Sequence, residues 1–190
     1  AHLNPAVTAA CVATGKPGPC TGEEGLCYAA SQTVGAFLAA CCNWGMYKNA
    51  IRTMEKSEGS AAWGNAFGVA HNSKFLGTRA LFLTEIGSTA ALLFGVNAIV
   101  DPELGAPAPA APFLIGSIVG LLIFVTGPVS GCGMNPARDL GPRLITLFAG
   151  WGTVAAEAAW VYTLGPVAGA ILGATMYDRL FRGVAPKKEA

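Results

Sequence analysis

Residues 133–139 read Gly133-Met134-Asn135-Pro136-Ala137-Arg138-Asp139, and residues 2–8 read His2-Leu3-Asn4-Pro5-Ala6-Val7-Thr8. The tripeptide Asn-Pro-Ala therefore occurs twice, and each copy opens an apolar run of about ten residues, too short to cross a bilayer. Asn is a favoured helix N-cap and Pro is favoured at the first helical position, so each copy predicts the start of a short helix. Two such half-helices in a membrane protein indicate an inverted repeat whose broken helices meet at the bilayer midplane.

The composition also indicates a membrane protein. Hydrophobic residues make up 53% of the chain and charged residues 12%, whereas a soluble domain carries about a quarter charged residues. The formal net charge of +1 gives no electrostatic case for binding nucleic acid. The six cysteines and two histidines show no metal-ligand spacing, so we expect no metal and no cofactor. Cys20 and Cys27 lie in a polar stretch where a disulfide could form, and the sequence alone does not decide this.

Four further apolar stretches are each about twenty residues long, the length that a helix needs to cross the hydrocarbon core. They are Tyr28–Ala50, Ala80–Val100, Pro112–Ser130 and Ala158–Tyr177. Residues 101–112 contain four prolines, so they cannot be helical throughout. The basic tail, residues 179–190, favours a cytoplasmic C-terminus, although basic residues on the opposite side weaken this argument.

The number of spans fixes how the two half-helices are oriented. A half-helix that enters the bilayer from one face and returns to it, followed by three crossings, places the second half-helix on the opposite face. Asn4 and Asn135 should therefore face each other near the centre of the molecule. The second repeat has two spans, a half-helix and one span, whereas the first has only its half-helix and one span, so we expect two preceding spans to be missing.

These motifs resemble the major intrinsic protein family, the aquaporins, and within it the aquaglyceroporin branch. The resemblance covers nearly the whole chain and is strongest over residues 127–143, GPVSGCGMNPARDLGPR. It implies an all-α membrane protein with an inverted repeat, four full transmembrane helices and two Asn-Pro-Ala half-helices. Residues 1–190 would form one channel domain: the rest of the first repeat (1–52), a connecting loop (53–79), the second repeat (80–178) and a tail (179–190).

A channel of this family passes small neutral molecules and excludes ions and protons. Opposed half-helix N-termini focus positive potential at the channel centre, which disfavours cations. Asn4 and Asn135 should cap the half-helices and donate hydrogen bonds into the pore. The resemblance places Arg138 in the selectivity filter, where its charge would repel cations. The remaining predicted pore residues, which adjoin the motifs or occupy filter positions, are Leu3, Cys132, Met134, Asp139 and Ile123.

Two polar residues are assigned structural roles. Glu85 lies within an apolar span and needs hydrogen-bond donors. The equivalent glutamate of the family braces the loop before the second half-helix through backbone N–H groups. Gln32, in the matching segment 31–37, is assigned to the same structural class.

The positions that separate water channels from glycerol channels are mixed in this sequence. Ile123 replaces the histidine of water channels and the glycine of glycerol channels, and Cys132 is more typical of water channels. We favour a channel for both water and glycerol over a strict water channel. The positions that resemble the glycerol branch are Tyr47, Asp139 and Arg143, and those that depart from it are Tyr162 and Thr163.

The leading hypothesis is thus a passive channel in an integral, multi-pass membrane protein. Its expected partners are membrane lipids, water and small polyols, and the family habit is a homotetramer. The alternative is a non-conducting, aquaporin-derived structural subunit of a larger membrane assembly, which the missing spans motivate. An enzyme is not favoured, because no nucleophile–base pair or metal set is visible.

Overall fold

In a computed structural model of the chain, residues 2–16, 21–59, 61–67, 77–149 and 156–182 are described, and their regular structure is entirely helical. The helices are α1 (Pro5–Thr14), α2 (Gly22–Glu58), α3 (Ala61–Phe67), α4 (Thr78–Val100), α5 (Ala111–Ser130), α6 (Pro136–Phe148) and α7 (Ala159–Tyr177), and the π-helical turn η2 (Asp178–Arg182) follows α7. Four of these described helices, namely α2, α4, α5 and α7 with part of η2, are long and apolar enough to cross a membrane. The expected all-α membrane fold with four spans is confirmed.

The first long helix extends further than the sequence predicted. α2 has 37 residues, in place of the predicted span Tyr28–Ala50. It begins earlier because Thr21 and Glu24 form a capping box, in which Thr21 Oγ1 accepts from the Glu24 backbone N–H at 3.1 Å. It ends later because its last turns consist mostly of good helix formers such as Lys, Glu and Met. The predicted loop 53–79 therefore begins inside α2 and also contains α3.

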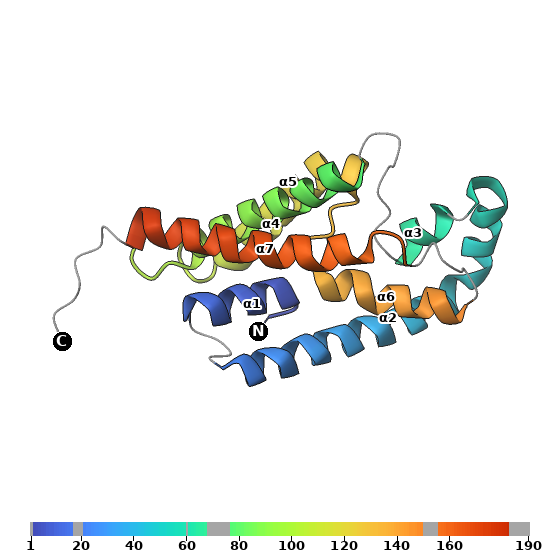
Figure 1. The fold of residues 1–190 in the computed structure, drawn as a ribbon, viewed down its shortest axis with the longest axis horizontal. Coiled ribbons are helices and arrows are strands. Elements are labelled where there is room, and N and C mark those ends of the chain that lie inside the picture. Colours follow the sequence, from blue (N-terminus) through green and yellow to red (C-terminus); the bar gives the residue numbers. More distant parts are fainter. Residues whose placement is uncertain (1, 17–20, 60, 68–76, 150–155, 183–190) are drawn as a thin grey trace.

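The two Asn-Pro-Ala copies each begin a short helix, as predicted. The Asn4 side chain accepts from the Ala6 N–H at 2.8 Å, and the Asn135 side chain accepts from the Ala137 N–H at 3.1 Å. A proline occupies the start of each helix, where its missing N–H is not needed. Figure 1 shows α1 and α6 end to end, with their N-termini adjacent and their axes running in opposite directions. α4, α5 and α7 lie on one side of this pair and α2 on the other.

Small residues allow the helices to pack closely. A Cβ added at Gly169 or Gly173 would collide with the backbone carbonyls of α4, so the Gly-x-x-x-Gly pair of α7 is where the two helices touch. On the other side of the molecule, a Cβ at Gly141 of α6 would lie 2.6 Å from the Ala36 Cβ of α2. These glycines bring α7 against α4 and α6 against α2.

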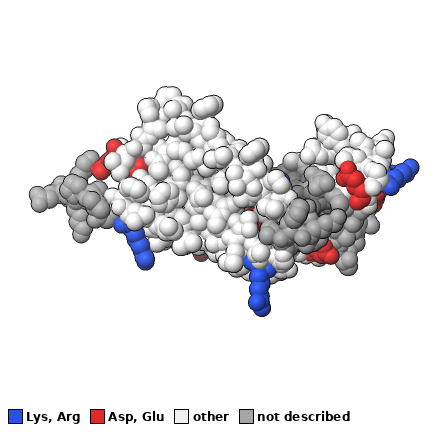
Figure 2. Space-filling view, turned by 90° about the horizontal axis from the view of Figure 1, so that it is seen from above, with Lys and Arg blue, Asp and Glu red and all other residues white. Residues whose placement is uncertain are grey.

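Many large apolar side chains are exposed on the surface, as expected for a protein in lipid. Figure 2 shows one face that is largely free of charged side chains, with the few that it carries near the periphery of the view. Large apolar side chains such as Phe113 and Phe124 of α5 are exposed. Cys27 is also exposed, and Cys20, its considered disulfide partner, lies outside the described residues together with the last eight residues of the predicted tail.

Candidate pore site

The two Asn-Pro-Ala motifs are bonded to each other across the centre of the molecule. The Asn4 side-chain amide donates to the Met134 carbonyl at 2.8 Å, and the Asn135 amide donates to the Leu3 carbonyl at 3.0 Å. Each asparagine thus caps its own helix with its oxygen and binds the opposite loop with its nitrogen. The predicted proximity of the two asparagines is confirmed by these reciprocal bonds.

A polar side chain of a long helix binds the backbone of each motif. Glu85 of α4 is fully buried, and its two carboxylate oxygens accept from the Gly133 N–H at 3.1 Å and the Met134 N–H at 2.9 Å. Gln32 of α2 plays the corresponding part for the first motif, since its Nε2 donates to the His2 carbonyl at 2.7 Å. Glu85 is buried and accepts from the backbone beside the second motif, as predicted, and its bracing role and the structural role of Gln32 stay predictions. Glu85 and Gln32 thus link the two motifs to the long helices α4 and α2.

A groove of about 920 Å³ runs beside the joined motifs. Its walls come from the segment before α1 and from α2, α3 and α6. Three of the predicted pore residues, Leu3, Asn135 and Arg138, line it, and the Arg138 side chain is exposed there. The α2 wall is rich in small residues, namely Gly35, Ala36, Ala39 and Ala40. The groove therefore combines the polar side chains of Asn135 and Arg138 with a stretch of small residues on α2.

Comparison with known proteins identifies the family. A family model described as Major intrinsic protein matches residues 1–177. The chain belongs to the major intrinsic protein family. Over 201 aligned residues it is 34% identical to the glycerol uptake facilitator protein of Haemophilus influenzae, covering 98% of this chain and 74% of that protein. It is 35% identical to aquaporin-9 of Rattus norvegicus over 93% of this chain, and this match spans 61% of that protein.

A solved structure shows the same fold. The X-ray structure of the aquaglyceroporin from Plasmodium falciparum superposes on 97% of this chain and 74% of that chain, with a TM-score of 0.83 and 23% sequence identity. At that identity the likeness concerns the arrangement of helices. The resemblance to the major intrinsic protein family inferred from the motifs is thus confirmed in sequence and in fold.

The other predicted pore residues, including Asn4 at the junction of the two motifs, are not part of the groove lining. Cys132 and Met134 are 3% and 4% exposed, in the loop between α5 and α6, and neither lines the groove. Asp139 is fully buried, so its carboxylate faces protein and not the groove. Ile123 of α5 is half exposed and also lies outside the groove lining. The pore roles of Cys132, Met134 and Ile123 therefore stay predictions.

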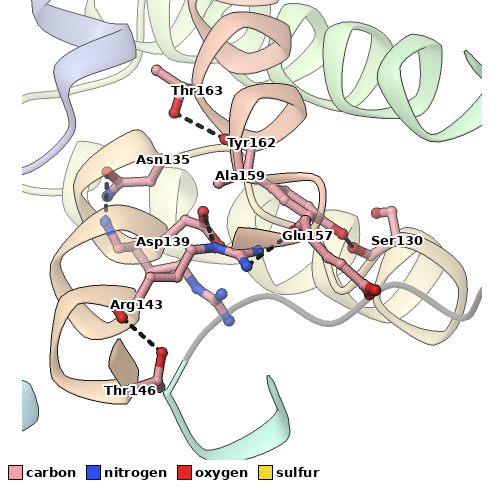
Figure 3. Close-up of polar contacts among 10 residues, drawn as sticks. Ser130, Asn135, Asp139, Arg143, Thr146, Glu157, Ala159, Tyr162 and Thr163 are labelled. Carbon is pink, nitrogen blue, oxygen red and sulfur yellow. Dashed lines mark hydrogen bonds and ion pairs between the residues drawn. The ribbon is translucent and has the colours of Figure 1, made fainter. Parts of the chain in front are cut away.

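A buried polar network lies behind the second motif (Figure 3). Arg143 Nε donates to the Asp139 carboxylate at 2.6 Å, and Arg143 also donates to the Glu157 carbonyl at 3.1 Å. The Arg143 guanidinium lies 5.5 Å from the ring centre of Tyr162, whose hydroxyl donates to the Ser130 carbonyl at 2.5 Å. The spacing of Asp139 and Arg143, four residues apart on a helix, is a pairing signal that sequence reasoning did not use.

No group of three or more metal-ligating side chains occurs within the part of the chain that the structure describes. The polar groups at the site are amides, hydroxyls, one guanidinium at the groove and paired carboxylates. Such groups bind and orient neutral hydroxyl compounds through hydrogen bonds.

Proposed function

We propose that this protein is a passive transmembrane channel for water and small neutral solutes such as glycerol. The observation that carries the proposal is the reciprocal bonding of two opposed half-helices through Asn4 and Asn135. Irregular backbone at membrane depth is tolerated where it is buried in protein or lines a water-filled cavity, and the residues flanking these motifs line a groove. The names of the glycerol uptake facilitator and aquaporin-9 relatives support the same substrates.

Charge exclusion would come from two sources. The N-termini of α1 and α6 each carry a partial positive charge, and because they are adjacent their fields add at the crossing point. Arg138, one turn into α6, adds a full positive charge at the groove. A cation that entered would lose hydration and meet only positive potential. A neutral molecule meets no such electrostatic barrier.

Asn4, Asn135 and Arg138 would also orient the permeant. A side-chain amide has two N–H donors, and one donor of each asparagine is used in the bond to the opposite loop. The second donor of each could bind a passing hydroxyl oxygen. A glycerol molecule in the groove would place its hydroxyls toward Asn135 and Arg138, and its carbon chain toward Gly35 or Ala36 of α2.

We also infer a homotetramer as the state of assembly. This inference is supported by family membership and by the exposed apolar side chains of α5, which need either lipid or a neighbouring subunit. Cross-linking of the purified protein in mild detergent measures the number of subunits. A monomer at all protein concentrations would contradict the inference.

Stopped-flow light scattering on vesicles that contain the purified protein tests the channel. Vesicles first shrink in a glycerol gradient and then swell as glycerol enters, so one trace reports both permeabilities. Empty vesicles are the control, and a sucrose gradient, which should give shrinkage without swelling, checks that the vesicles are intact. If the protein accelerated neither phase relative to empty vesicles, the channel proposal would be wrong and the non-conducting alternative would be preferred.

A further inference from the structure

The loop between α5 and α6 has a backbone that needs external support. Cys132 and Met134 both have φ of 49°, and they are two of the three non-glycine residues with positive φ among those the structure describes. This left-handed conformation is unfavourable for residues with a Cβ, and it persists where surrounding contacts fix it. The same loop presents the Met134 carbonyl to Asn4, so its conformation determines where the two motifs join.

Glu85 supports one half of this loop, and Tyr162 of α7 lies against the other. The Tyr162 side chain is fully buried, and its hydroxyl donates to the Ser130 carbonyl at the end of α5. Ser130 Oγ in turn accepts from the Cys132 N–H at 3.1 Å. The hydrogen-bond chain therefore reaches the first residue with strained backbone.

Tyr162 also sets the shape of the space that the loop fills. A Cβ added at Gly133 would lie 2.5 Å from the Tyr162 ring carbon Cδ1 and 2.9 Å from Glu85 Oε2. Gly133 is therefore held between the ring and the carboxylate. The same ring lies beside the Arg143 guanidinium, which is bonded to Asp139 in α6.

We propose that Tyr162 is a positioning residue that holds the α5–α6 loop in the conformation that presents the Met134 carbonyl to Asn4, at the junction of the two motifs. It contacts the loop through its hydroxyl and ring, and it contacts the middle of α6 through Arg143, so it fixes the loop relative to the helix that carries Arg138. The proposal rests on the proposed channel function for its effect on selectivity. Tyr162 is one of the positions at which this sequence departs from the glycerol branch.

The variant Tyr162→Phe removes the hydroxyl and keeps the ring. Tyr177→Phe is its matched control, because Tyr177 is also a buried tyrosine of α7, and its hydroxyl donates one hydrogen bond, to Asp101 at 2.9 Å. The two residues are separated by 15 positions, or about 22 Å along a helix. Tyr177→Phe, which removes a bond to a carboxylate, should lose at least as much thermal stability as Tyr162→Phe, whereas only Tyr162→Phe should loosen the loop.

The first measurement is the rate at which a water-soluble maleimide labels Cys132, followed by mass spectrometry of the peptide that carries it. Cys132 is 3% exposed, so its labelling requires the loop to open. Loss of one buried hydrogen bond should raise the labelling rate about fivefold in Tyr162→Phe. Tyr177→Phe should label at the parent rate. An unchanged rate in Tyr162→Phe, or an equal rise in Tyr177→Phe, would overturn the proposal.

The second measurement is the ratio of glycerol to water permeability in vesicles. Orientation of a polyol depends on donors at fixed positions more than passage of water does, so Tyr162→Phe should lower this ratio about fivefold, the rate equivalent of one net hydrogen bond. A ratio that stays at the parent value would exclude an effect of Tyr162 on selectivity. If the parent protein conducts neither solute, the channel function fails, while the labelling result still decides whether Tyr162 holds the loop.

Discussion

Replacing Glu85 by Gln should strongly destabilise the protein, because Glu85 is the fully buried acceptor for two consecutive backbone N–H groups. A carboxamide has the same shape but only one acceptor oxygen, and its NH2 group would face one of the two N–H donors. One charge-assisted hydrogen bond is lost, worth about 1.5–3 kcal/mol, and one buried N–H is left unsatisfied at a further cost of about 1–3 kcal/mol.

Relief of the buried carboxylate's desolvation offsets part of this loss, so we expect a net destabilisation of about 2–3 kcal/mol. Glu85→Ala should cost more, about 3–5 kcal/mol, because both N–H groups lose their acceptor and a cavity remains. The contacts with Gly133 and Met134 predict that the damage concentrates in the α5–α6 loop.

Unfolding by denaturant in detergent micelles measures these differences, with Glu23→Gln as the control. Glu23 is an exposed residue in the first turn of α2, so neutralising it should change the free energy of unfolding by less than about 1 kcal/mol through the helix dipole. If Glu85→Gln unfolds within about 0.5 kcal/mol of the parent, the carboxylate does not brace the loop and the reasoning is refuted.

Three further predictions concern the groove, the helix contacts and the thiols. Arg138→Val should leave glycerol and water flux measurable but admit cations, because it removes the positive charge at the groove. A cation conductance equal to the parent's would show that Arg138 is not the charge filter. Gly173→Ala should lower stability by about 1–3 kcal/mol, because its Cβ meets the α4 backbone. Gly45→Ala, whose Cβ has open space, should raise stability by about 0.5–1 kcal/mol. Thermal unfolding measures both variants, and equal shifts would refute the packing argument. Maleimide should label exposed Cys27 at least tenfold faster than buried Cys132 in the parent. A tenfold difference corresponds to a free energy of about 1.4 kcal/mol for opening the loop around Cys132. Equal rates would mean that the α5–α6 loop is open.

The local chemistry of the sequence was sufficient to predict the half-helices and most spans. Asn followed by Pro satisfies the cap and first position of a helix, so α1 and α6 were predicted from a few adjacent residues. The buried role of Glu85 followed from its charge within an apolar segment. These features depend on interactions within one turn of helix or on the cost of burying charge. Both can be recognised from residues that are neighbours in the sequence.

The rest depends on which surfaces meet in the folded protein. Asp139 was predicted to line the pore because it adjoins Arg138, but the next residue of a helix points about 100° away, and there it meets Arg143. Tyr162 was noted only as a departure from a family pattern. Its contact with Ser130 joins residues 32 positions apart, which no periodicity predicts. The length of α2 was underestimated because the apolar pattern marks the part of a helix inside lipid, and the helix continues beyond it.

The bonds between the two motifs also constrain when the first half-helix can reach its final position during synthesis. Asn4 and the Met134 carbonyl are 130 residues apart, so the ribosome has synthesised most of the chain before this bond can form. Until then the first half-helix lacks its partner, and an unpaired polar loop is costly in hydrocarbon. Closure of so long a loop is also slow. The insertion of α1 to its final depth should therefore be a late, post-translational event that awaits the second repeat, and an insertion intermediate stalled before α6 would hold α1 near the membrane surface.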